Sequence, residues 1–297
     1  MKKLLFLILI FSSCSPGRWS LNESNDYFKP TGNVDTEFTQ GLRLQKTIKD
    51  STGSHSYYGG QNILTPSHKQ ISEPILDDRP YAAFLYGGYD ANYSKDEDTQ
   101  DTVGIIVGVV GPLALGKQSQ NNIHNLIDIP RAQGWSNQLD NELGLMATLE
   151  RKQINAKYFI GELQFDHMLL GGVNLGNVMT QGYVGNLIRL GKNPRSVFDI
   201  SEITARSSLD HESTPVSYYG FLGLKGRAIA RNIFLDGNTF SESQSVNKEP
   251  FVGEVFGGVN FTYGNTGITY TLTHITSEYE ERGRGNTFGS LSFDWSW

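Results

Sequence analysis

The sequence predicts an all-β protein, a transmembrane antiparallel β-barrel of about twelve strands with a short helix in a long loop. Three observations support this fold class. The chain ends on a strand of strictly alternating polarity, similar segments recur along most of its length, and no apolar stretch after the first residues is long enough to cross a bilayer as a helix. The composition agrees, since glycine and aromatic residues are frequent while hydrophobic residues reach only 38%.

The last strand carries the clearest pattern. Apolar and polar residues alternate to the final position, with Leu291, Phe293, Trp295 and Trp297 set against Ser292, Asp294 and Ser296. Successive side chains of a strand point to opposite faces, so one face is apolar and the other polar. On the edge strand of a soluble sandwich such an aromatic row would promote aggregation, whereas lipid would cover it on a barrel.

Alternating segments upstream predict the remaining strands. The two best examples span 251–263 and 159–169, and others lie near 34–48, 80–93, 102–112, 138–152, 178–191, 215–229 and 267–280. Weaker runs near 19–28 and 230–236 bring the number to about twelve, in line with the even strand numbers of bacterial barrels. Short turns at 153–155 and 264–265, and longer loops at 49–78, 113–137, 192–214 and 237–250, predict a two-ended barrel.

The first residues predict export. Lys2 and Lys3 precede an apolar run, Leu4 to Phe11, which is too short to span a bilayer. We therefore interpret residues 1–17 as a signal peptide cleaved near 13–18, and residues 18–297 as one outer-membrane barrel domain. The segment before Cys14 loosely resembles a lipobox, so this single cysteine is either lipidated or removed with the leader.

Charge and motifs exclude several functions. The formal net charge of −6 argues against a nucleic-acid partner, although a divalent cation could bridge an acidic protein to an anionic lipid. The run from Gly111 to Gln118 nearly matches a phosphate-binding loop, but Pro112 removes a cradling N–H group and Gln118 replaces the hydroxyl residue that holds magnesium. Neither a Gly-x-Ser-x-Gly nor a His-Glu-x-x-His pattern occurs.

One segment, residues 116–128, departs from the strand pattern and predicts the loop helix. Gln120 and His124 are four residues apart, which places them on one helix face. Such a helix, packed against the barrel wall, could hold a base near the bilayer surface. A lone histidine is more often a solvent-exposed residue than a catalytic one, so the spacing alone leaves both interpretations open.

Several ordered motifs resemble those of the LpxR-type lipid A deacylases. They are Asn25-Asp26-Tyr27-Phe28, the segment from Asp35 to Leu44, Asp78-Arg79-Pro80-Tyr81-Ala82, Gln120-x-x-x-His124 with the segment from Gln133 to Glu142, and a closing section that includes 234–240, 245–248 and 279–290. The resemblance covers nearly all of the chain after the leader.

The resemblance implies a twelve-stranded outer-membrane enzyme that hydrolyses the 3′-linked acyloxyacyl group of lipid A in lipopolysaccharide and depends on Ca²⁺. By matching positions, it implies that His124 is the general base, that Gln120 orients or binds at the helix face, and that Thr39 lines the site. It also implies that Asp26 ligates calcium, with Asn25 beside it. Oxygen ligands suit calcium, and a histidine of near-neutral pKa suits ester hydrolysis.

Two departures from the family pattern concern the site. Where some members carry a lysine before the Asp-Arg motif, this chain has Leu76 and Asp77. Where an acidic residue follows the catalytic helix, this chain has Pro130, and Asp128 is a shifted candidate. Two alternatives to the deacylase therefore stay open: a non-catalytic barrel of the same ancestry and a barrel phospholipase.

Overall fold

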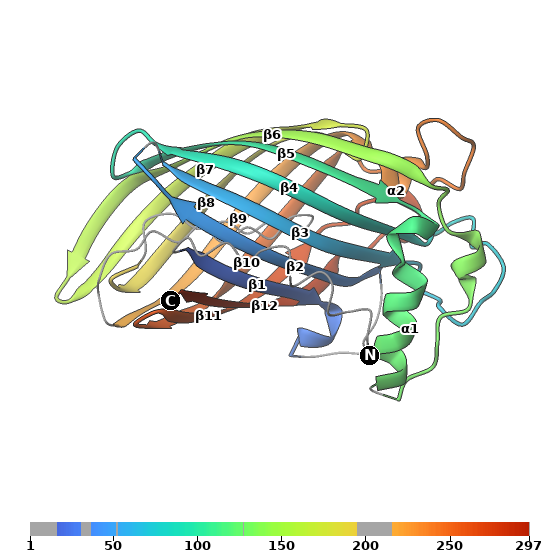
Figure 1. Cartoon of the computed structure of the whole chain (residues 1–297), viewed down its shortest axis with the longest axis horizontal. Helices are drawn as coiled ribbons and strands as arrows, with labels where there is room; N and C mark the ends of the chain where they lie inside the picture. The colour runs from blue at the N-terminus through green and yellow to red at the C-terminus, as the bar shows by residue number, and fades with distance from the viewer. Residues whose placement is uncertain (1–16, 31–36, 52, 127, 195–215, 297) are drawn as a thin grey trace.

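The computed structural model describes residues 17–30, 37–51, 53–126, 128–194 and 216–296. Residues 1–16 of the predicted signal peptide lie outside these residues. The described chain forms one closed antiparallel barrel in which each strand pairs with its sequence neighbours and β1 pairs with β12 (Figure 1). The fold class is confirmed, including the number of strands and the short helix in a long loop.

The twelve strands are β1 (Arg18–Asn25), β2 (Glu37–Lys49), β3 (Ser54–Thr65), β4 (Ala82–Ser94), β5 (Thr99–Val110), β6 (Glu142–Ile160), β7 (Leu163–Gly176), β8 (Met179–Lys192), β9 (Val216–Asn232), β10 (Phe251–Tyr263), β11 (Thr266–Ile275) and β12 (Asn286–Ser296). The helices are η2 (Asp26–Phe28), η3 (Pro112–Ala114), α1 (Gly116–Leu126), η4 (Gly134–Asn137), α2 (Ile233–Asp236) and η5 (Glu280–Arg282). No helix in the described part of the chain is long and apolar enough to cross a membrane.

Three of the strand predictions were wrong in detail. Strand β3 lies inside 49–78, which the sequence predicted as loop, because its glycines and hydroxyl residues hide the alternation. Residues 230–236 form the end of β9 and α2 instead of a separate strand. Strand β6 continues through the expected turn at 153–155, and the chain reverses at Gly161, whose φ of 62° suits glycine, inside the expected strand 159–169.

The lumen of the barrel is packed with paired polar groups. Arg189 donates two hydrogen bonds to Asp166, at 2.7 and 2.9 Å, and both side chains are fully buried. Lys225 forms a further buried ion pair with Glu254, with Nζ 3.0 Å from Oε2. Towards the loop-bearing end the lumen is filled by an apolar cluster that includes Phe84. Side chains in a water-filled pore would be exposed, so these parts of the lumen do not form an open channel.

The outer face of the wall is apolar, as a lipid-facing surface requires. On β5, Val103, Ile105 and Val107 are each nearly half exposed, while the residues between them point inward. Near the chain termini, the Phe293 and Trp295 rings stack on the outside with centroids 5.4 Å apart. Aromatic residues at this level are typical of the membrane interface of outer-membrane barrels.

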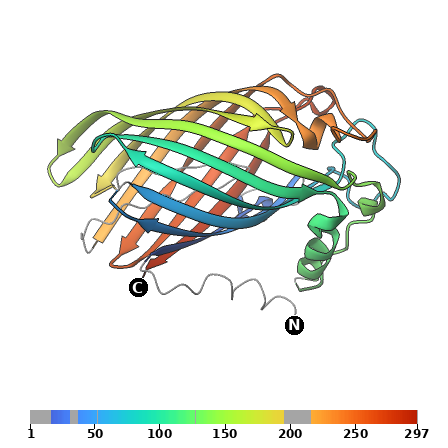
Figure 2. The ribbon, with the colours of Figure 1, turned by 45° about the horizontal axis from the view of Figure 1, so that its top comes forward.

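The two ends of the barrel differ. At the end that holds the chain termini, β2–β3, β4–β5, β6–β7 and β10–β11 are joined by turns of two to four residues. The connection from β8 to β9 at this end is longer, and most of it, where the sequence predicted the loop 192–214, lies outside the described residues. At the other end the connections 66–81, 111–141, 233–250 and 276–285 are long, and α1 lies among them (Figures 1 and 2). Outer-membrane barrels place short turns in the periplasm and long loops outside the cell, so α1 lies at the outer leaflet.

Candidate active site

Helix α1 and its flanking loop pack against the outside of the barrel wall. On β3 and β4 the inward positions include Tyr58 and Phe84, so Ile63 and Ala83 point outward. These two residues are nevertheless fully buried, because Ala114, Ala132 and Trp135 of the β5–β6 loop cover them. The helix therefore stands between the wall and the lipid or water around it, and Figure 2 shows it alongside the barrel.

Glycine at the start of α1 allows this close packing. A Cβ atom on Gly116 would collide with the Cβ of Ala83 and would lie 2.6 Å from the ring of Trp135. From this contact the helix buries one stripe, Gly116, Gln120 and His124, at four-residue spacing, and its other positions are more exposed. The prediction that Gln120 and His124 share a face is confirmed, and that face is the buried one.

Gln120 is fixed by Trp135. The indole Nε1 donates a hydrogen bond of 2.7 Å to Gln120 Oε1, and both side chains are about 1% exposed. Oε1 therefore serves as an acceptor, and the amide Nε2 must be a donor. Among the described residues Nε2 has no hydrogen-bond partner, although it is buried. A buried donor of this kind is suited to bind a polar oxygen of a ligand.

His124 is oriented by the backbone. Its Nδ1 lies 2.6 Å from the carbonyl oxygen of Pro130, and a carbonyl can only accept, so the proton is on Nδ1. The basic nitrogen is consequently Nε2. The side chain is only 4% exposed, and the helix end is closed by Ile129 N–H, which donates to His124 O. Pro130, which stands where the family pattern has an acidic residue, thus contacts the imidazole through its carbonyl, while the shifted candidate Asp128 is exposed.

Asn25 and Asp26 lie at the loop-bearing end of β1. The Asn25 side chain caps η2, because its Oδ1 accepts a hydrogen bond of 2.8 Å from Tyr27 N–H. The Asp26 carboxylate is buried, at 1% exposure. The turn is held by Tyr270, whose hydroxyl donates to Phe28 O at 2.8 Å. Asn25 and Asp26 thus belong to one turn whose backbone is held at both ends.

The strand order brings this turn and α1 to one side of the barrel. Strands β1, β2, β3 and β4 are consecutive neighbours in the wall, η2 continues β1, and α1 packs on β3 and β4. Thr39 falls on β2 between them, but its side chain lies outside the described residues, so its role stays a prediction. Asn25, Asp26, Gln120 and His124 therefore share one side and one end of the molecule.

Polar residues on the outer wall connect the two halves, and sequence reasoning missed them. Gln40 is in register with the outward Ile63, and its Nε2 lies 3.5 Å from Glu23 Oε1. One row nearer the membrane, Gln61 donates to Ala114 O at 2.5 Å and so ties β3 to the start of α1. Polar groups are costly on a lipid-facing wall, and here they are compensated by hydrogen bonds to each other and to the loop that leads into α1. Their outward position could be found only once the register was known.

In the part of the chain that the structure describes, no three His, Cys, Asp or Glu side chains group together as a metal site. The oxygen donors of Asp26 and Asn25 are nevertheless of the hard type that calcium prefers, and thiolate ligands are absent from the described residues. The donor types of Asp26 and Asn25 are therefore ones that Ca²⁺ accepts, although two side chains alone do not complete a coordination sphere.

The comparisons with known proteins now decide the family. A family model described as "Outer membrane protein LpxR" matches residues 4–297. The chain belongs to the LpxR family. It is an outer-membrane protein, in agreement with the predicted location.

The structure of LpxR from Salmonella typhimurium is similar to this one with a TM-score of 0.85 at 21% sequence identity, over 94% of this chain and all of that one. The β domain of the Bordetella autotransporter BrkA matches 95% of this chain and all of that one at 11% identity, with a TM-score of 0.45. No curated protein matches the sequence.

This chain lacks the lysine that some members of the LpxR family carry before the Asp-Arg motif. Leu76, at the expected place, is 77% exposed and offers no cation. Lys69 in the same loop is instead buried, and its carbonyl oxygen accepts hydrogen bonds from Gln133 N–H at 2.8 Å and from the Tyr81 hydroxyl at 3.3 Å. The backbone of Lys69 is thus joined to the loop that carries Trp135, seven residues before Leu76.

The Asp-Arg motif, Asp78 and Arg79, joins two loops of this protein. Asp78 accepts hydrogen bonds from Ser67 and from the Tyr279 hydroxyl, and Arg79 donates to Glu278 at 2.6 Å. These contacts join the β3–β4 loop to the β11–β12 loop. Burial and the hydrogen bond to Asp78 both raise the pKa of Tyr279, so its hydroxyl remains a donor at neutral pH.

Proposed function

We propose that the protein is a lipid A deacylase that hydrolyses the 3′-linked acyloxyacyl ester of lipopolysaccharide. The observation that carries the proposal is the position of His124, a buried and oriented base on the outer face of an outer-membrane barrel, at the level of the outer leaflet. Ester bonds of lipid A lie at this level, where the acyl chains meet the sugar. Membership of the LpxR family supports the same substrate class.

His124 acts as the general base in this proposal. Its Nε2 takes a proton from a water molecule, whose oxygen attacks the ester carbonyl carbon. The bond between that carbon and the sugar oxygen then breaks, and the proton passes from Nε2 to the leaving oxygen, which becomes a hydroxyl group. The Pro130 carbonyl supports the step, because it keeps the Nδ1 proton in place and favours the imidazolium that forms transiently.

Gln120 binds the substrate rather than the water. Its Oε1 is engaged by Trp135, so the side chain presents the N–H groups of Nε2, which suit a carbonyl or sugar oxygen. Glu23, Gln40 and Gln61 extend this polar surface along the wall towards Asn25. A polar strip within an apolar wall fits an amphiphile whose sugar head and acyl chains must both be placed.

Calcium completes the proposal, with Asp26 and Asn25 as the residues of this chain that would hold it. When bound, Ca²⁺ supplies positive charge against the carbonyl oxygen of the ester as that oxygen becomes negative. The buried carboxylate of Asp26 and the capped turn that follows it keep these donors in place without requiring a rearrangement of the strand.

The test is mass spectrometry of lipid A from cells that produce the protein, with and without Ca²⁺. We expect loss of the 3′-linked acyloxyacyl group with the wild-type chain, and unmodified lipid A with His124→Ala. His55→Ala is the matched control, because His55 lies at the opposite end of the barrel, where its Nδ1 pairs with the Tyr89 hydroxyl.

The same experiment separates the alternatives. Release of acyl chains from phospholipid instead of lipid A would identify a barrel phospholipase. Unaltered lipid A and phospholipid in Ca²⁺, from a folded barrel, would identify a non-catalytic member of the family and would contradict the proposal.

A further inference from the structure

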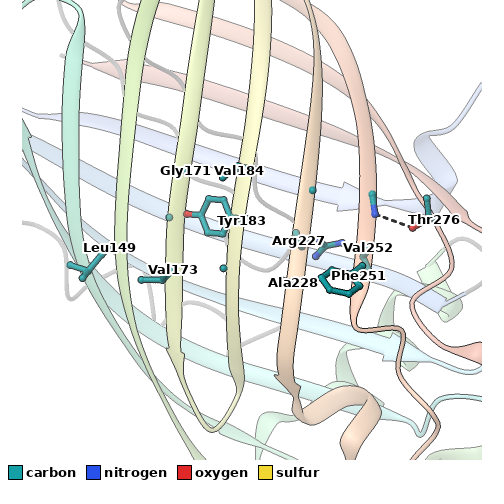
Figure 3. A pocket seen from close by; sticks show the side chains of 14 residues that line it. Leu149, Gly171, Val173, Tyr183, Val184, Arg227, Ala228, Phe251, Val252 and Thr276 are labelled. Atoms are coloured by element: carbon teal, nitrogen blue, oxygen red, sulfur yellow. Dashed lines mark hydrogen bonds between the residues drawn. The ribbon is translucent and has the colours of Figure 1, made fainter.

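A groove of about 900 Å³ crosses the barrel wall over β7, β8, β9 and β10 (Figure 3). Its rim is formed by side chains that point outward, among them Val184 at 70% exposure and Phe251 at 76%. A second hollow of about 530 Å³, which shares Val184, Gly226 and Thr276, continues it towards the middle of the barrel past Leu169 and Leu224. The size is that of a binding cleft for a small molecule or one long chain.

The floor of the groove is made by four outward glycines, Gly171, Gly182, Gly226 and Gly253, one on each strand. None of the four has a positive φ. A Cβ atom added to them would meet its nearest neighbour at 3.6, 4.0 and 3.4 Å at Gly171, Gly182 and Gly253, and nothing within 4 Å at Gly226. The fold itself therefore does not require glycine at these positions.

Inward glycines of the same strands differ. A Cβ atom on Gly172 would lie 2.6 Å from the Tyr183 hydroxyl, and one on Gly223 would collide with the Phe256 ring. Packing explains those two residues, whereas it leaves the outward four unexplained. Glycine inside a strand weakens the strand and often marks a site that another molecule approaches closely. The common property of the four is the space that they leave on the outside of the wall.

We propose that this groove binds one saturated acyl chain of lipopolysaccharide at a site separate from the candidate active site. The lining of the larger hollow is almost wholly apolar, while the smaller one also contains Asn186 and His274. The wall here faces the membrane, so a hydrocarbon chain is the ligand that the surroundings supply to the larger hollow. The upper end of the groove reaches Phe251 and Thr276 at the loop-bearing end, which faces the outer leaflet, where lipopolysaccharide resides.

The shape favours a chain over a second barrel. The wall of another barrel is convex and could not reach the glycine floor, which lies below the side chains that flank the groove. A flexible hydrocarbon chain can lie along this floor. Thr276 keeps the upper end rigid, because its backbone N–H donates to Gly253 O at 2.9 Å and its hydroxyl accepts from Gly253 N–H at 3.0 Å (Figure 3).

The groove is also remote from the site around His124. In the ring of twelve strands the candidate active site covers β1 to β4, and the groove covers β7 to β10, which is the opposite side. A chain bound here is not the one presented to His124 for hydrolysis. The groove would hold a neighbouring lipopolysaccharide molecule, and its occupation does not depend on the proposed reaction.

Native mass spectrometry of the purified full-length barrel with added lipid A tests the proposal by counting bound lipid molecules. Gly226→Leu places a side chain in the groove at a position where its Cβ atom would meet nothing within 4 Å. We expect it to weaken binding of one lipid A molecule about tenfold, which corresponds to lost contact with about two methylene groups. Gly220→Leu is the matched control: Gly220 also points outward on β9, and its Cβ atom would meet nothing nearer than 3.9 Å, but it lies outside the groove.

Ala228→Leu, on the rim of the same groove, repeats the test should Gly226→Leu fail to fold. Equal lipid A binding by the wild-type chain and both groove variants would overturn the proposal. So would phosphatidylethanolamine that displaces the bound molecule as readily as lipid A does. Dimers that the wild-type chain forms and Gly226→Leu abolishes would show that the groove belongs to a contact between two barrels instead.

Discussion

The packing of α1 on the barrel wall can be tested at its tightest point. Gly116→Ala adds one methyl group where the nearest ring atom of Trp135 would be 2.6 Å away, whereas ordinary contacts lie at 3.4–4 Å. The start of the helix must therefore move outward by about 1 Å. Displacements of about 1 Å at a catalytic group can lower rates on the order of 100-fold. We expect the rate of lipid A deacylation to fall by about this factor.

The loss should come from position and not from unfolding of the barrel. Overpacking of this kind costs about 1–3 kcal/mol, and it falls on a loop that lies outside the strand network. Deacylation by purified protein would be followed by mass spectrometry, with circular dichroism to check the barrel. Lys117→Ala, at the exposed neighbouring position, should keep the wild-type rate.

A double variant tests whether the contact between α1 and Ala83 positions His124. Ala83→Gly removes the nearest atom on the wall side, so Gly116→Ala combined with Ala83→Gly should recover part of the rate. A folded Gly116→Ala variant with full activity would show that the contact between α1 and the wall does not position His124. A slow single variant that Ala83→Gly does not improve would point to another cause, such as a changed loop conformation.

Three further predictions concern other parts of the molecule. Asp26→Asn should raise the Ca²⁺ concentration needed for half-maximal deacylation by at least about tenfold, measured by calcium titration, without changing the melting temperature. Asp166→Asn leaves Arg189 buried without its charge partner and should cost about 3–5 kcal/mol in thermal or denaturant unfolding, while lipid A remains a substrate. Tyr279→Phe should loosen the loop junction by about 1.5–3 kcal/mol, seen as faster proteolysis within 66–81. The pKa of Tyr279 is higher in the folded protein than in the unfolded chain. The stabilisation by its hydroxyl is therefore complete below the unfolded pKa of about 10 and is lost as the pH rises through the folded pKa. The wild-type junction should weaken in alkali, whereas the junction of Tyr279→Phe should not.

The alternation of apolar and polar residues was enough to predict the barrel. Lipid outside the wall favours apolar side chains and the lumen favours polar ones, so the two types alternate along each strand. The same rule explains the failure at β3. Its inward residues include Tyr58 and Asn62, and its outward residues include Gln61 and the covered Ile63, so neither face has one consistent polarity. The strand number was nevertheless right, since the missed β3 was balanced by an extra strand assigned at 230–236, where β9 runs into α2.

The candidate site was predictable only in part. Spacing placed Gln120 and His124 on one helix face, and the family resemblance raised them above other polar pairs, but the sequence contains no sign of which carbonyl orients the imidazole. The backbone carbonyl of Pro130 orients the imidazole, and every residue type has such a carbonyl. The burial of Lys69 could not be predicted for a related reason, because its backbone carbonyl is covered by Gln133, which lies far along the chain.

The outward polar residues show what additional signal the fold provides. In isolation Gln40 and Gln61 are unremarkable strand residues, and half of all strand positions in a barrel are polar. Once the register assigns them to the lipid-facing side, each becomes an exception that must be compensated. Gln61 is compensated by Ala114 O and Gln40 by Glu23, and both pairs lie between η2 and α1. These two polar pairs lie near the candidate site, while Asn186 on β8 and His274 on β11 also face outward elsewhere on the wall, so the register narrows the search and the family resemblance completes it. The outward glycines of β7 to β10 are the complementary exception, residues that leave space on the same apolar face instead of filling it.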